Sequence, residues 1–153
     1  MKDDVFYINN GRTISLEYYL RSCNTFDEFE KKVNEELLND SIRVGEYLRD
    51  LLNKYDKKAS VVSIDAGLNH SYVGNIINGK KNNPSRNVLI CICFALGATL
   101  DETQYLLKYA GHAPLYVRRK RDVIIWFGLL KQESLDTVNT NLIDRGLTPL
   151  YKE

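Results

Sequence analysis

The chain has 153 residues, of which 44% are hydrophobic and 27% are charged, a composition typical of one globular domain with room for an extension. No apolar run approaches the roughly 18 residues of a membrane span. The first ten residues lack the basic and then apolar layout of a secretory signal. We therefore expect a cytoplasmic protein that does not enter the membrane.

The cysteine content argues against disulfides and metal binding. Cys23, Cys91 and Cys93 form an odd number with no framework spacing, which predicts reduced thiols. Cys91 and Cys93 lie two positions apart in a predicted helix, so they point to nearly opposite faces. Because the two thiols cannot grip one ion together, we expect no metal site and no cofactor.

The formal net charge of +1 hides an uneven distribution. Residues 1–40 carry 5 Lys and Arg against 9 Asp and Glu, residues 41–120 carry 12 against 6, and residues 121–153 carry 4 against 5. The basic excess therefore lies in the central part of the chain, as a polyanionic partner requires.

Residues 1–40 are expected to form an acidic, partly helical extension. The beginning of the chain fits either a small hairpin around Asn10-Gly11 or an arm that leads into a helix. Further on, Thr25 with Glu28 forms a capping box. The apolar positions that follow this box predict a helix to about residue 38.

The most regular apolar pattern in the chain predicts a helix over residues 41–55. Its apolar residues recur three and four positions apart: Val44, Tyr47, Leu48, Leu51, Leu52 and Tyr55. Two short helices follow, over residues 60–66 and 70–78, and each ends at a glycine, Gly67 and Gly79.

Two start signals mark the next pair of helices. Asn83-Pro84 predicts an N-cap asparagine followed by proline at the first helical position. Thr99 with Glu102 then forms a capping box for a further helix, which ends at Gly111.

A two-helix extension is expected over residues 113–153. Four residues of its first helix give one apolar face: Val123, Ile124, Phe127 and Leu130. Ser134 is the predicted N-cap of the second helix, which ends at Gly146.

The C-terminal pair of helices resembles the pair before it. With a shift of 35 residues, residues 85–116 align with residues 120–151 without a gap, and 10 of the 32 positions are identical. The clearest match sets TLDETQYLLKYAGHAPLY against SLDTVNTNLIDRGLTPLY. Either the chain contains an internal repeat, or two unrelated helices share common cap and stop signals. In both cases we expect the last helices to pack as an extension of the preceding pair.

Two short helices meet at Gly67 within SVVSIDAGLNHSYVGNIINGKK. The turn between them needs a residue that tolerates positive φ, and the small Ser63 would let the helices approach closely. Val73 and Ile76 share one face of the second helix and point to the core. The open side then carries polar residues where a major-groove reader needs them: His70, Ser71, Tyr72 and Asn75.

These residues resemble the phage-repressor-like (XRE-type) helix-turn-helix family. The resemblance covers about residues 42–110 and depends on the leading amphipathic helix, on VSIDAGLNHSYVGNIINGKKNNPS and on LICICFALGATLDE. It implies an all-α, lambda-repressor-like five-helix domain over residues 41–112. It also implies a transcriptional regulator that binds double-stranded DNA as a homodimer on a pseudo-palindromic operator.

The resemblance also implies which residues contact DNA. The recognition-helix contacts fall by position on Asn69, His70, Ser71, Tyr72 and Asn75. Of these, Asn75 can form a bidentate pair with adenine. The phosphate contacts fall on Lys57 and Lys58 before the first short helix and on Lys80, Lys81 and Asn82 after the second.

Two positions depart from the family. Ala59 stands where glutamine is common at the start of the helix before the turn, and Ile77 stands where glutamate is common two residues before the closing glycine. The family also contains members whose main work is protein contact. The alternative function is therefore a protein-interaction module on the same fold, with a partner protein bound through the terminal extensions.

Catalysis is not expected from this sequence. His70 and His112 are the only histidines, and no nucleophile elbow, phosphate-binding loop or paired-cysteine metal signature appears. RNA binding is a weaker alternative, because the sequence shows no aromatic stacking platform and no RNA-binding signature. A homodimer is expected because one short helix covers too few base pairs for specificity, and Trp126 and Phe127 are the candidate residues of the dimer surface.

Overall fold

The structure is a computed structural model that describes residues 20–32, 40–81 and 83–151. All regular secondary structure in these ranges is helical, which confirms the predicted all-α class for the described part of the chain. None of the described helices is long and apolar enough to cross a membrane. The Asn10-Gly11 segment, the end of the N-terminal helix and Asn82 lie outside the described residues.

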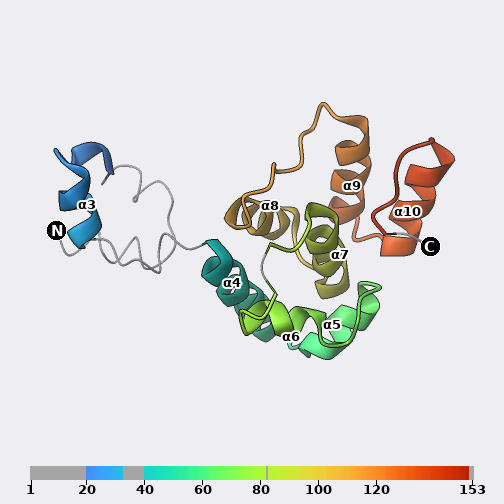
Figure 1. Ribbon diagram of the computed structural model, residues 1–153. Coiled ribbons are helices and arrows are strands. Elements are labelled where there is room, and N and C mark those ends of the chain that lie inside the picture. The colour runs from blue at the N-terminus through green and yellow to red at the C-terminus, as the bar shows by residue number, and fades with distance from the viewer. Residues whose placement is uncertain (1–19, 33–39, 82, 152–153) are drawn as a thin grey trace.

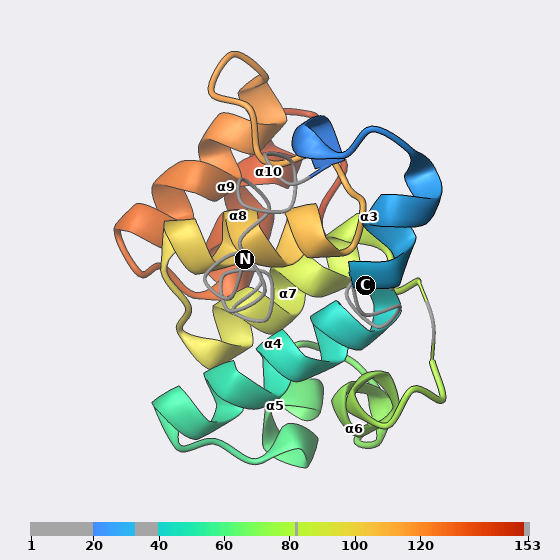
Figure 2. The same ribbon diagram turned by 90° about the vertical axis from the view of Figure 1, so that its left-hand side faces the viewer.

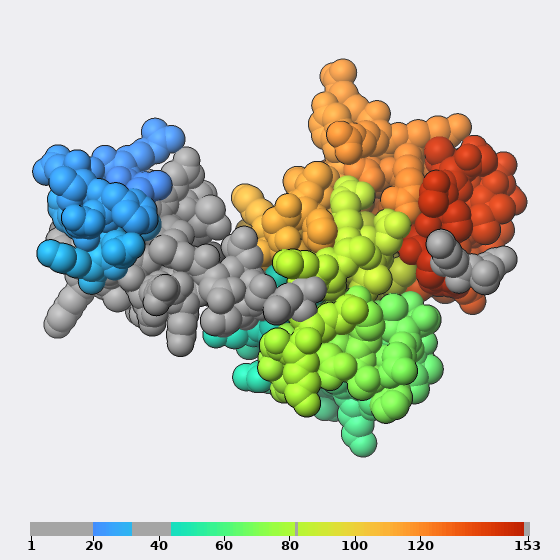
Figure 3. Space-filling model, viewed as in Figure 1, coloured from blue at the N-terminus to red at the C-terminus, as the bar shows by residue number. Residues whose placement is uncertain are grey.

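The helices follow the predicted order, and Figure 1 shows their arrangement. They are α3 (Phe26–Lys32), α4 (Asp40–Tyr55), α5 (Ala59–Asp65), α6 (Tyr72–Ile77), α7 (Arg86–Leu96), α8 (Leu100–Tyr109), α9 (Lys120–Leu130) and α10 (Leu135–Asp144). Helices α5 and α6 form the lower lobe of the molecule, whereas α9 and α10 form its upper right part (Figures 1 and 3). Helix α4 crosses between the lower lobe and α8 (Figure 2).

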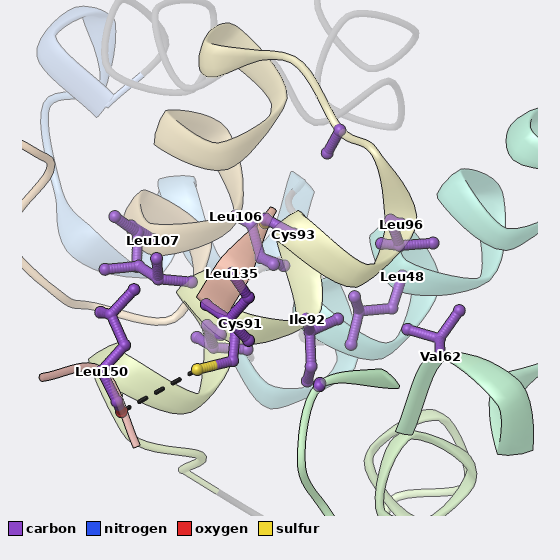
Figure 4. Packing of buried hydrophobic residues seen from close by; sticks show 14 of the residues in the cluster. Leu48, Val62, Cys91, Ile92, Cys93, Leu96, Leu106, Leu107, Leu135 and Leu150 are labelled. Atoms are coloured by element: carbon purple, nitrogen blue, oxygen red, sulfur yellow. Dashed lines mark hydrogen bonds between the residues drawn. The ribbon is translucent and has the colours of Figure 1, made fainter. Parts of the chain in front are cut away.

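One buried apolar core joins α4 to α10. Helix α7 lies at its centre, because the five consecutive residues 89–93 are all buried, a pattern typical of a helix covered on every side. Side chains from α4, α5, α8, α10 and the C-terminal segment meet around it (Figure 4). The C-terminal helices therefore pack as an extension of the preceding pair, as predicted.

The local start and stop signals are largely confirmed. The capping box of α8 is complete, since Thr99 and Glu102 each accept a backbone N–H from the other. Ser134 caps α10 by accepting from the backbone N–H of Thr137. At the N-terminus of α3, Thr25 accepts from the N–H of Glu28 at 3.2 Å, while the carboxylate of Glu28 accepts from a neighbouring N–H.

The predicted start of α7 is wrong. The N-cap of α7 is Ser85, which accepts from Val88 N, whereas Asn83 has a left-handed φ of 55° and lies outside the helix. The predicted apolar face of α9 exists, but it is not the face that packs against the core. Phe127 is 51% exposed, and the buried face contains Ile125 and Leu129 instead.

The internal repeat is visible in the helix bounds and in the chain turns. Helix α10 begins and ends 35 residues after α8, and α9 lies 34 residues after α7. The turn after α7 places Gly97 at a φ of 76°, and the turn after α9 places the equivalent Gln132 at 52°. In both turns a backbone N–H returns to a carbonyl five residues earlier, from Ala98 to Cys93 and from Glu133 to Gly128.

The two copies also share their long-range hydrogen bonds. Nε of Arg86 donates to Ala113 O at 2.8 Å, and Nε of the equivalent Arg121 donates to Thr148 O at 2.8 Å. Each guanidinium also donates to the carbonyl of the next residue, a proline. Because equivalent residues make equivalent contacts, the similarity is an internal repeat. Shared cap and stop signals alone would not produce these matching long-range hydrogen bonds.

The same two arginines join the copies to each other. Arg86 binds Asp122 of the second copy through both carboxylate oxygens, at 3.2 and 3.0 Å. Arg121 donates in turn to Asn87 of the first copy at 3.1 Å. Since Asp122 is the repeat equivalent of Asn87, the contact between the copies is reciprocal. A carboxylate that is only 4% exposed thereby has its charge compensated.

Candidate nucleic-acid interface

Helices α5 and α6 form the unit in which the sequence predicts the recognition helix. Gly67 joins them with a φ of 78°, which glycine adopts without strain. The buried hydroxyl of Ser63 donates to Ala59 O at 2.8 Å and accepts from Val73 N at 3.0 Å. That N–H lies in the first turn of α6, where the helix offers no partner. Ser63 therefore binds the two helices together, in agreement with the predicted close approach.

Helix α4 supports the other end of α6. A Cβ atom added to Gly45 would lie 3.1 Å from Ile76 O and 3.3 Å from the Cα and O atoms of Ile77. The glycine thus allows the backbone of α4 to approach the last turn of α6. Helix α6 is held at its first turn by Ser63 and at its last turn by Gly45.

The predicted recognition residues fall on two structural elements. Helix α6 begins at Tyr72, later than predicted, so that Asn69 and His70 precede it and Ser71 is its N-cap. Oδ1 of Asn69 accepts from the backbone N–H of Ser71 at 3.0 Å and from its hydroxyl at 2.8 Å. Asn69 therefore shapes the chain before α6. Asn69, His70 and Ser71 are all exposed.

Four of the predicted residues form a cluster along α6, between its first residue and the loop that follows it. The backbone N–H groups of Lys80 and Lys81 both donate to Asn75 O, at 2.8 and 3.0 Å, so the basic loop folds back onto the helix. Nζ of Lys81 lies 4.6 Å from the centroid of the Tyr72 ring, within the range of a cation–π contact. Tyr72 and Asn75 are half-buried, and both lysines are exposed.

The two lysines before α5 have different environments. Nζ of Lys57 donates to Ala95 O at 2.9 Å, in the last turn of α7. A cation is favourable there because it faces the negative end of the helix dipole. Lys58 is the N-cap residue of α5, makes no side-chain capping bond and is exposed. The structure thus gives Lys57 a role in packing that the sequence did not indicate.

The two positions that depart from the family contribute to packing. Ala59 and Ile77 are both partly buried against the core. Ala59 also supplies the carbonyl that binds Ser63. Neither residue presents a polar side chain to the side of α6 that would face DNA.

A polar cluster that the sequence did not predict fastens α4 to α8. The carboxylate of Glu102 accepts from Nζ of Lys54 at 2.7 Å, from the hydroxyl of Tyr55 and from Thr99 N at 2.9 Å. Burial raises the pKa of Glu102, but these hydrogen bonds outweigh it and hold the pKa below its usual value. The capping box identified Glu102, but Lys54 and Tyr55 lie almost 50 residues away and no local pattern indicates them.

The buried cysteines and His112 lie in packed surroundings. Burial raises the pKa of Cys91 and of Cys93 to about 12, so neither thiol ionises readily. His112 Nε2 lies 2.8 Å from Pro84 O. Within the described ranges no group of three or more His, Cys, Asp or Glu side chains is placed to hold a metal ion.

Comparisons with protein-family models, with curated proteins and with solved structures found no match. The assignment of a function therefore depends on the geometry and charge of this chain itself.

Proposed function

We propose that residues 41–112 form a lambda-repressor-like helix-turn-helix domain that binds double-stranded DNA. The observation that carries the proposal is the α5–Gly67–α6 unit, in which Ser63 and Gly45 hold α6 at both ends while its polar residues stay accessible. A short helix held in this way fits the major groove. The basic excess of the central part of the chain supports the same partner.

The particular function that we propose is a sequence-specific transcriptional regulator in the cytoplasm. Asn75 pairs with adenine, while His70 and Ser71 reach guanine acceptors or phosphate. Lys58, Lys80 and Lys81 neutralise phosphates and set the register of α6 in the groove. Because Lys57 is bound to Ala95 O, its contribution to phosphate binding is smaller than that of Lys58.

Selection from a random DNA library with the purified protein tests this proposal. We expect an enriched motif and an affinity whose logarithm falls by about 0.9 per neutralised phosphate for each decade of salt. Asn75→Ala should cost about 1–3 kcal/mol at one base position, while Lys80→Ala should weaken binding to all sequences alike. No enriched motif at moderate salt would contradict the proposal.

A second candidate, a protein-interaction module, is favoured by the outer face of α9. Val123, Phe127 and Leu130 are 37%, 51% and 58% exposed on this helix, and an apolar patch of this kind is typical of a contact surface. The module predicts a partner that Lys80→Ala and Lys81→Ala leave bound and that Phe127→Glu releases. Loss of the partner on the two lysine changes alone would argue against it.

The partner on α9 can also be a second copy of the chain, since we propose a homodimer. In both views α6 lies at the lower end of the body and α9 at the upper end (Figures 1 and 2). A dimer through α9 would place the two copies of α6 away from the contact, with half-sites one helical turn, roughly 34 Å, or a multiple of it apart. Light scattering gives the mass, and the half-site spacing in the selected motif shows whether α9 is the dimer surface. A monomeric mass at micromolar concentration would contradict the homodimer.

A further inference from the structure

Residues 147–151, which we term the C-terminal strap, are fastened to three helices. Arg121 of α9 binds the carbonyls of Thr148 and Pro149, at 2.8 and 3.3 Å. Asn139 of α10 accepts from Leu150 N at 2.7 Å. In α7 the thiol of Cys91 faces Leu150 O at 3.9 Å (Figure 4). The strap therefore has a fixed course up to its last described residue, Tyr151.

This course brings Tyr151 to the turn between α5 and α6. A Cβ atom added to Gly67 would lie 3.8 Å from Cδ1 of Tyr151, which is ordinary van der Waals contact, so the phenol ring lies beside the turn. The ring is partly buried against the core. Its hydroxyl donates to the carboxylate of Asp136. Gly67 itself stays exposed, and the ring of Tyr151 lies against one side of the turn.

The first copy of the repeat provides an internal comparison. Its strap has the equivalent anchors, since Arg86 binds the carbonyls of Ala113 and Pro114, and Gln104 accepts from Leu115 N at 2.7 Å. The tyrosine at its end, Tyr116, is 50% exposed. The same unit therefore ends once at the surface and once at the helix-turn-helix turn.

We propose that Tyr151 is a positioning residue that holds the turn at Gly67 and thereby fixes the orientation of α6. Ser63 and Gly45 hold the two ends of α6, and Tyr151 supplies the third support at the joint between α5 and α6. The C-terminal copy of the repeat is thus a brace for the recognition helix. The effect of Tyr151 on DNA recognition rests on the proposed DNA-binding function, whereas its contact with the turn does not.

Three variants of the full chain test this proposal. Tyr151→Ala removes the ring, Tyr151→Phe keeps the ring and removes the hydroxyl, and Tyr116→Ala is the control in the first copy. The first readout is the exchange rate of the Leu68 amide, which donates to Ser63 O at 2.8 Å directly after the turn. The second is the ratio of affinities for the selected DNA motif and for unrelated DNA.

Tyr151→Ala should speed exchange at Leu68 by about fivefold or more and reduce the affinity ratio by a similar factor, the lower end of coupling between sites. Tyr151→Phe and Tyr116→Ala should leave both close to wild type. If Tyr151→Ala unfolds the chain, Tyr151→Leu takes its place. Unchanged exchange at Leu68 in these variants, or an equal change in Tyr116→Ala, would overturn the proposal. A wild-type protein without DNA preference would refute the proposed function, while the exchange rates would still decide the brace.

Discussion

Gly45→Ala is the most direct test of the contact between α4 and α6. The new methyl group would lie 3.1–3.3 Å from three atoms of Ile76 and Ile77, all of them backbone atoms. Backbone atoms cannot swing away as a side chain can, so α4 or α6 must move. Overpacking of this kind typically costs about 1–3 kcal/mol. Alanine is intrinsically better than glycine in a helix by about 1 kcal/mol, which offsets part of the cost.

We therefore expect Gly45→Ala to lower the free energy of unfolding by up to about 2 kcal/mol. Gly74→Ala is the matched control, because Gly74 lies in α6 with no atom within 4 Å of an added Cβ. It should gain up to about 1 kcal/mol from helix propensity alone. Thermal unfolding measures both changes, at about 2–4 °C per kcal/mol for a chain of this size.

The comparison of the unfolding free energies of Gly45→Ala and Gly74→Ala tests this contact. If Gly45→Ala were as stable as Gly74→Ala, the backbone of α4 would not contact the last turn of α6 in solution. A stable Gly45→Ala protein with normal DNA affinity would also remove one of the three supports that we assign to the proposed recognition helix.

Three further variants probe contacts that the sequence did not reveal. Ser63→Ala should cost about 1–3 kcal/mol in denaturant unfolding, because the buried N–H of Val73 loses its acceptor. The pKa of Glu102 in the folded state lies below its usual value of 4.5, so the ionised carboxylate stabilises the fold above pH 4.5 and loses this effect as the pH falls through the folded-state pKa. Glu102→Gln should therefore weaken the dependence of the free energy of unfolding on pH below 4.5. Asn139→Gln should raise the melting temperature, because Nδ2 of Asn139 is buried without a partner among the described residues, whereas the amide of the equivalent Gln104 donates to Leu115 O at 3.0 Å. A lower melting temperature would indicate that the longer side chain does not fit.

Features that depend on neighbouring residues are those that the sequence predicts well. The Ser134 cap needs only a hydroxyl and a backbone N–H three residues later, and the Thr99–Glu102 box adds a carboxylate at the same spacing, so the sequence specifies both completely. Asn83-Pro84 fits the same kind of rule but fails. Ser85 competes for the capping position, and proline is equally at home in the extended segment before a cap.

Contacts between residues that are far apart in the sequence cannot be predicted from a local pattern. The sequence contains both arginines of the repeat, but nothing near them indicates that Arg86 binds Asp122 or that Arg121 binds the C-terminal strap. The role of Lys57 is missed for the same reason, since its partner, Ala95 O, is a backbone group that any residue can provide. The candidate site was therefore predictable as a set of residues, whereas the supports that hold it were not.

The exposure of the apolar face predicted for α9 has a cause in the repeat itself. Helix α9 is apolar nearly all round, so its periodicity fits more than one buried face. The equivalent of Phe127 in α7 is Ile92, which is fully buried in a helix that packs against both α4 and α5. The second copy retains an apolar residue at this position, but no described helix covers it as α5 covers α7. The outer face of α9 is thus the counterpart of an occupied interface, and this gives the protein-interaction candidate its physical basis independently of DNA.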